Sequence, residues 1–180
     1  MRGMLAAAAL AACAAGAHAA PSHAKLDGFA GVPFGATIGA AQTALGVKAK
    51  PDFDPPDKTA ELKFDGDVFG EPATLNFKFG AQTAAGEGAM DSVYAMKPLG
   101  AARAGAAACY ARGKQALALA RAQYGAPTMQ FDIGPAANDP LGPGFNAAFH
   151  FDDGALIRIS EAACVLLVDA YSPQAARGAP

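Results

Sequence analysis

The sequence predicts an α+β fold in which two helices pack on one face of an antiparallel sheet. Three observations lead to this prediction. Several segments alternate strictly between polar and apolar residues, which is typical of antiparallel strands with one solvated face. Two other segments carry apolar residues at helical spacing and end in glycine, in "TALG" and "AQYG". Two cysteines remain in the folded part, Cys109 and Cys164, and they can join the second helix to the last strand.

The first 19 residues have the pattern of a signal peptide. Arg2 supplies a positive charge, Met4 to Ala15 form an apolar stretch, and Ala17-His18-Ala19 satisfies the small-x-small rule for cleavage. We expect cleavage after Ala19 and export to the periplasm or the medium. The folded domain is then expected at 25–173, followed by a loose tail at 174–180.

Cys13 allows a second interpretation of the same segment. It ends the stretch "LAAC", which resembles a bacterial lipobox, and cleavage before it would leave an acylated Cys13 that anchors the protein to a membrane. The apolar stretch before Cys13 is short and only one basic side chain precedes it. We therefore favour cleavage after Ala19 and keep lipidation of Cys13 as the alternative.

The count of cysteines predicts a disulfide bond. The chain has 3 cysteines, and either cleavage leaves Cys109 and Cys164 as the possible pair. In an oxidising compartment this pair is expected to be bonded, and closing a loop of about fifty residues would contribute about 4 kcal/mol to stability. The alternative is a catalytic thiol that uses His150 as its base.

The first half of the domain is predicted to hold one short helix and three strands. Residues 29–34 form an extended lead-in. Thr37 then caps a helix that ends at Gly46. The stretch "KPDFDPPDK" is expected to be a loop, because its aspartates lack the glycine and glutamate that an EF-hand requires at fixed positions. Alternation predicts strands over 60–69, 71–80 and 90–99.

The second half is predicted to begin with the longer helix, over 101–125. Its apolar stripe runs from Ala106 to Tyr124, and its four cations, Arg103, Arg112, Lys114 and Arg121, are expected on a solvated face. A strand at 128–133 precedes a hairpin at 145–160. A three-residue turn with Gly154 in the left-handed conformation keeps apolar partners together, pairing Phe149 with Ile157 and Ala147 with Ile159. The last strand, 162–173, is apolar enough to be buried on both faces.

The lead "GVPFGATIGAAQTALG" resembles the openings of small bacterial envelope domains, in which a glycine-containing turn feeds a helix that ends in "LG" and several strands follow. The SmpA/OmlA outer-membrane lipoproteins and the beta-lactamase-inhibitor-protein-like repeats have this pattern. The resemblance implies helices on an antiparallel sheet and a protein that acts by contacting other proteins. The resemblance assigns no functional role to any individual residue of this chain. A weak internal repeat leaves open a division into two similar halves, 25–100 and 101–173.

The sequence offers no residue that we can assign a catalytic, cofactor-binding or metal-binding role. A net charge of −2 provides no basic surface for nucleic acid, and no interior segment is long and apolar enough to cross a membrane. No phosphate-binding loop, "HExxH", paired "CxxC" or "GxSxG" motif occurs. His150 could act as a base with Asp152 or Asp153, but a surface histidine beside an aspartate turn is the simpler interpretation. The phenylalanines at 64, 69, 77, 79, 145, 149 and 151 either fill the core or line a groove, and we favour the core.

These observations predict a non-catalytic binding or accessory protein of the bacterial envelope whose open sheet face contacts a protein partner. The first alternative is a carrier of a small ligand or lipid, which needs an apolar pocket between helix and sheet. The second alternative is a hydrolase built around His150, which needs a nucleophile within hydrogen-bond reach of the ring.

Overall fold

A computed structural model of the chain describes residues 25–80, 88–100, 102–134 and 142–179. The first half of the chain contains β1 (Gly28–Phe29), β2 (Val32–Pro33), α1 (Ile38–Leu45), β3 (Asp52–Asp54), β4 (Thr59–Val68), β5 (Glu71–Phe79) and β6 (Met90–Pro98). The second half contains α2 (Ala102–Tyr124), β7 (Met129–Ile133), β8 (Gly144–His150), β9 (Leu156–Ala162), β10 (Val165–Tyr171) and α3 (Pro173–Ala176).

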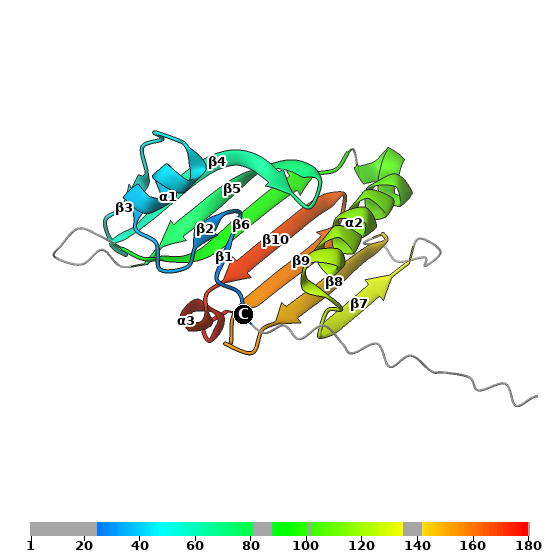
Figure 1. The fold of residues 1–180 in the computed structure, drawn as a ribbon. Coiled ribbons are helices and arrows are strands. Elements are labelled where there is room, and N and C mark those ends of the chain that lie inside the picture. Colours follow the sequence, from blue (N-terminus) through cyan, green and yellow to red (C-terminus); the bar gives the residue numbers. More distant parts are fainter. Residues whose placement is uncertain (1–24, 81–87, 101, 135–141, 180) are drawn as a thin grey trace, which may run out of the picture.

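The fold is mostly β, so the predicted α+β class with two helices packed on the sheet is wrong. Strands make up 45% of the described residues and helices 23%. The main sheet has eight antiparallel strands in the order β3-β4-β5-β6-β10-β9-β8-β7, and β1 and β2 form a separate ribbon (Figure 1). In each half of the chain one helix precedes four strands of this sheet, and the two sets of strands join where β6 pairs with β10.

Helix α1 explains why the predicted helical layer does not form. Its ends are where the sequence placed them, with the Thr37 hydroxyl 3.2 Å from the amide of Ala40 and Gly46 in the left-handed conformation at φ 66°. However, the helix has only eight residues, and Ala41 is its one buried side chain. Such a short helix buries too little apolar surface to cover four strands, so the β1–β2 ribbon contributes Phe29 and Val32 to the core beside it.

Helix α2 lies along β8 and β9 (Figure 1). The predicted stripe is correct in its centre, where Cys109, Leu117 and Ala120 are buried and Gly113 approaches Glu161 closely. The backbone at Gly105 is not helical, with φ −140°, so the regular helix begins after it. Cys109 and Cys164 lie at disulfide distance, with Cα atoms 5.1 Å apart, which ties α2 to the turn between β9 and β10.

One face of the sheet carries the core. Its largest fully buried side chains include Phe77, Phe79 and Phe149, in agreement with the preference for a core role of the aromatic residues. The predicted hairpin register is also correct: Phe149 pairs with Ile157, Ala147 pairs with Ile159, and Gly154 has φ 88°.

Arg112 and Arg121 lie on the exposed side of α2, as the sequence predicted, and Lys114 is partly exposed. All three also contact residues of other elements. Arg112 binds both carboxylate oxygens of Glu71 on β5 and donates a hydrogen bond of 2.6 Å to the carbonyl of Leu99. Lys114 binds Asp132 on β7, and Arg121 donates to Gln130 on the same strand. The side chain of Arg103 lies outside the described residues. These contacts link α2 to β5 on one side and to β7 on the other.

Two short segments also differ from expectation. Residues 52–54, predicted to be loop, pair with β4 as the edge strand β3. The segment 174–180, predicted to be a loose tail, begins within α3, whose first turn is capped by Ser172 at 3.2 Å from the amide of Ala175.

Candidate functional site

The main sheet has an outer face, defined here as the face opposite the core. The strand registers place its side chains in three transverse rows. The first row is Asp65, Thr74, Met96, Leu167, Ser160, Asn146 and Phe131. The second is Lys63, Asn76, Tyr94, Asp169, Arg158, Ala148 and Met129. The third is Glu61, Lys78, Ser92, Tyr171, Leu156 and His150. Helices α1 and α2 lie on the other side, where they contribute to the core.

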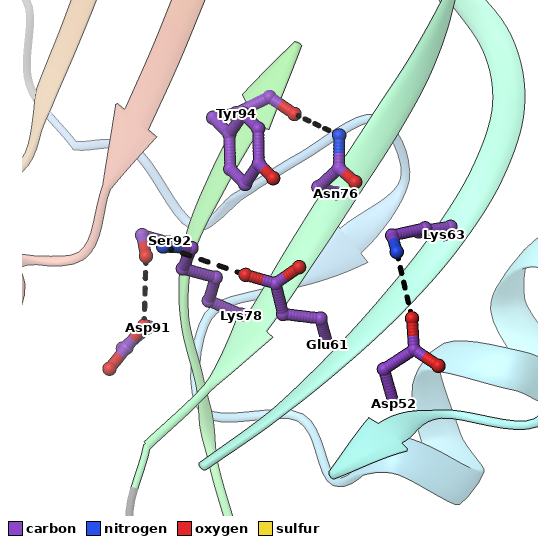
Figure 2. Close-up of polar contacts among 8 residues, drawn as sticks. All are labelled: Asp52, Glu61, Lys63, Asn76, Lys78, Asp91, Ser92 and Tyr94. Atoms are coloured by element: carbon purple, nitrogen blue, oxygen red, sulfur yellow. Dashed lines mark hydrogen bonds and ion pairs between the residues drawn. The ribbon is translucent and has the colours of Figure 1, made fainter. Parts of the chain in front are cut away.

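Polar pairs occupy the outer face of β3 to β6. Figure 2 shows Lys63 beside Asp52 at 2.7 Å and Lys78 beside Glu61 at 3.6 Å. The Asn76 amide lies 3.4 Å from the carbonyl of Tyr94. Glu61 and Lys78 are directly opposite each other on β4 and β5, whereas Lys63 reaches Asp52 diagonally across β4 and β3. The lysines on the outer face of β4 and β5, Lys63 and Lys78, are therefore both paired with carboxylates.

Aromatic rings and charges alternate at the centre of the outer face. The Lys78 ammonium lies 5.1 Å from the centre of the Tyr94 ring, and the Arg158 guanidinium lies 5.8 Å from that of Tyr171. Partial burial raises the pKa of the Asp169 carboxyl, although the nearby Arg158 acts in the opposite direction. Between Tyr94 and Tyr171 the surface is hollowed by about 210 Å³.

Exposed apolar side chains lie beside this centre. Met96 and Leu167 are directly opposite each other on β6 and β10, and they are 57% and 41% exposed. Toward the β7 edge, Met129 and Phe131 are 65% and 64% exposed and border an open hollow of about 690 Å³. Large apolar groups placed together in water on one face are typical of a binding surface.

A further open hollow, of about 770 Å³, lies between β3 and the C-terminal residues. The charged side chains of its lining are acidic except for Lys78: Asp52, Asp54, Asp57, Glu61 and Asp91. Within the described ranges, however, no three histidine, cysteine or acidic side chains are arranged so that they could hold a metal ion.

His150 lies at the solvated end of the outer face. Its Nδ1 is 2.6 Å from the hydroxyl oxygen of Thr128, and its own amide is 3.2 Å from the same oxygen. Asp153, one of the two carboxylates considered as its partner, accepts hydrogen bonds from the amides of Leu26 and Ala155. The Thr128 hydroxyl also lies 2.9 Å from the carbonyl of Ala148, so it links β7 to β8 as part of the strand edge.

Glu161 is the one buried carboxylate on the core side of β9 that the sequence did not single out. It is 2% exposed and lies under α2. Its Oε1 accepts a hydrogen bond of 3.1 Å from the amide of Cys164, whereas Oε2 has no partner among the described residues. Burial raises the pKa of this carboxyl, and the bond from Cys164 only partly offsets the effect.

Sequence reasoning missed Met96, Tyr94 and Leu167 as surface residues. The stretch "VLLVD" was predicted to be buried on both faces because it is uniformly apolar, but Leu167 points to the outer face and is 41% exposed. The available signal was the strand period of two: residues out of phase with the core positions must lie on the other face.

Comparisons of the chain with protein-family models, with curated proteins and with solved structures found no match. In the part of the chain that the structure describes, none of the helices combines the length and the apolar character needed to cross a membrane. Cys13 and the remainder of the first 19 residues lie outside the described residues.

Proposed function

We propose that this chain is an exported, non-catalytic protein that binds a protein partner through the outer face of its sheet. The observation that carries the proposal is the exposed pair Met96 and Leu167 at the centre of eight strands. Tyr94 and Arg158 lie in the next row of the outer face, and Tyr171 lies one row further. Tyrosine, methionine and arginine are enriched in the buried centres of protein interfaces, and paired polar groups are typical of their rims.

The alternatives have less support. A carrier needs an empty apolar pocket between helix and sheet, whereas Ala116, Leu117 and Ala120 of α2 are buried in the shared core. For a hydrolase, the hydroxyl beside His150 is engaged with the backbone of β8, as described above. Neither alternative has an observation that favours it over protein binding.

A paired comparison of surface variants tests the proposal. A photo-crosslinking residue is placed at Leu167 or, as the control, at Leu119, which is 51% exposed on the outside of α2. We expect position 167 to capture a defined envelope protein that position 119 does not capture. The same capture should be lost when Met96→Glu is added, because a charge at the centre of the contact cannot be buried without a partner. Equal products at both positions, or capture that survives Met96→Glu, would contradict the proposal.

Intact mass of the mature protein from soluble and membrane fractions tests the expected export. A soluble product that begins at Ala20 would support the signal peptide 1–19. A membrane product that begins at acylated Cys13 would support the lipoprotein alternative and would place the binding face close to the membrane. A product that retains Met1 in both fractions would contradict export.

A further inference from the structure

The eight-stranded sheet has two edges, β3 and β7, and they differ in how they are protected. Strand β3 has only three residues, two of which are Asp52 and Asp54, and it is followed directly by Pro55 and Pro56. Short length, charge and proline are the features by which edge strands avoid pairing with another chain. This edge is therefore closed to further strands.

Strand β7 lacks these features. Its five residues, "MQFDI", include no proline and no lysine. The single charge, on Asp132, faces α2, where Lys114 and the hydroxyl of Tyr110 bind it. The outer side of the strand presents Met129 and Phe131, both about two-thirds exposed. In an edge strand every second backbone N–H and C=O points away from its one neighbour, so β7 can accept another strand.

We propose that β7 pairs in antiparallel fashion with β7 of a second copy of this chain, with the two-fold axis at Phe131. The two main sheets would then form one continuous sheet of sixteen strands, eight from each copy. This register is self-complementary. Phe131 faces the partner's Phe131, and Met129 faces the partner's Ile133, all on the outer side. On the helix side, the Gln130 amide faces the partner's Asp132, so no like charges meet.

Neighbouring registers are less favourable. Moving the axis to Asp132 would place two carboxylates opposite each other. Moving it to Gln130 would place Ile133 opposite the partner's Pro127, which has no N–H to donate. A shift by a single residue would bring the apolar outer side of one copy against the polar helix side of the other. The side chains of β7 therefore favour pairing with β7 of a second copy, in the register centred on Phe131.

Charge substitutions on the axis test the dimer. The molar mass of the wild-type protein, measured by light scattering from micromolar to near-millimolar concentration, should approach that of two chains. Phe131→Glu and Phe131→Lys should each give monomers, because like charges would face each other. An equimolar mixture of the two should recover the dimer. Phe53→Glu on the opposite edge is the matched control, since Phe53 is 55% exposed, and it should leave the dimer unchanged.

Cysteine cross-linking tests the register. Phe131→Cys should form a disulfide-linked dimer on a non-reducing gel. Met129→Cys alone should not, whereas a mixture of Met129→Cys and Ile133→Cys should. A wild-type monomer at every concentration, a dimer broken by Phe53→Glu but not by Phe131→Glu, or cross-linking through Met129→Cys alone would overturn the proposal.

The dimer does not depend on the proposed partner-binding function. Leu167 lies on β10, three strands away from β7. Met96, on β6, is further away still. Met96→Glu should therefore abolish partner capture from position 167 and leave the molar mass at that of two chains, so failure of one proposal can be told from failure of the other.

Discussion

The two halves of the main sheet, β3–β6 and β7–β10, present different surfaces on the same continuous face. The outer side of β3–β6 carries charge pairs such as Lys63 with Asp52 and exposes one large apolar side chain, Met96, on the strand that borders β10. The outer side of β7–β10 exposes Leu167, Met129 and Phe131. The helix-side covers differ too. A ribbon and the eight-residue α1 lie over the first half, and the long α2, linked through Cys109 and Cys164, lies over the second.

This difference would let one sheet separate its stability from the proposed binding of a partner. The second half has a cover fastened by a cross-link and by the contacts of Lys114 and Arg121 to β7. Because this cover stabilises the core side, the outer side can expose apolar groups. The first half is covered by shorter elements, and apart from Met96 and Tyr94 on β6 its outer side carries mainly polar pairs.

The largest expected change in stability follows loss of the disulfide bond, which joins α2 to the turn between β9 and β10. The cross-link closes a loop with a sequence separation of 55, so Cys109→Ser with Cys164→Ser should lower the free energy of unfolding by about 4 kcal/mol. Urea unfolding measures this change, and hydrogen exchange should show that protection falls more in β7–β10 than in β3–β6. Reductant added to the double variant is the control. An unchanged unfolding midpoint would contradict the role given to the cross-link.

The next largest effect compares the packing of the two helices. A Cβ atom at Gly113 of α2 would lie 2.9 Å from Cγ of Glu161 and 3.0 Å from the Phe145 ring, so Gly113→Ala should cost about 2 kcal/mol by overpacking. Gly39→Ala in α1 is the matched control, because a Cβ there meets nothing within 4 Å. It should instead stabilise by up to about 1 kcal/mol. Thermal unfolding of both variants checks the contrast, and similar behaviour of the two would contradict it.

A smaller effect concerns the pH dependence of the second half. Because burial raises the pKa of Glu161, its protonated form is favoured in the folded state, and this stabilisation is lost as the pH rises through the folded-state pKa. Glu161→Gln should therefore stabilise the protein on the order of 1 kcal/mol at neutral pH and should have little effect in acid. Urea unfolding at several pH values measures the difference. If Glu161→Gln were no more stable than the wild-type protein at neutral pH, burial of the ionised carboxylate would not be destabilising the folded state.

The smallest effect is expected in the first half. The hydrogen bond from Lys63 lowers the pKa of Asp52, so Lys63→Met should return that pKa toward its ordinary value, as measured by NMR titration. Both groups are exposed, and solvent screens them, so the thermal unfolding midpoint should hardly change. A marked fall in the unfolding midpoint would contradict this prediction and would mean that the polar pairs contribute substantially to stability.

Several elements could be predicted from the sequence because short-range chemistry specifies them. Thr37 and Gly46 mark the ends of α1 through capping and a left-handed φ. The hairpin around Gly154 has the predicted register because only one register keeps Phe149 and Ile157 together in the core. The pairing of Cys109 with Cys164 follows from the number of cysteines left in the folded part.

The fold class and the candidate face could not be predicted in the same way. Helical periodicity identified α1 correctly but did not show that eight residues would be too short to form a layer over the sheet. The cations of α2 have the spacing of a solvated face, yet Arg112 reaches Glu71, which is 41 residues away in the chain. Such contacts depend on how distant segments meet and leave no local pattern.

By itself, the sequence determined the alternation of the strands, the ends of α1, the turn at Gly154 and the pairing of the cysteines, because each follows from neighbouring residues or from simple counting. Only the tertiary structure decided the order of the eight strands, the exposure of Met96 and Leu167, and the contrast between the edges β3 and β7. Antiparallel alternation shows that a strand has two faces, but which face is covered depends on the helices and ribbon that pack against it.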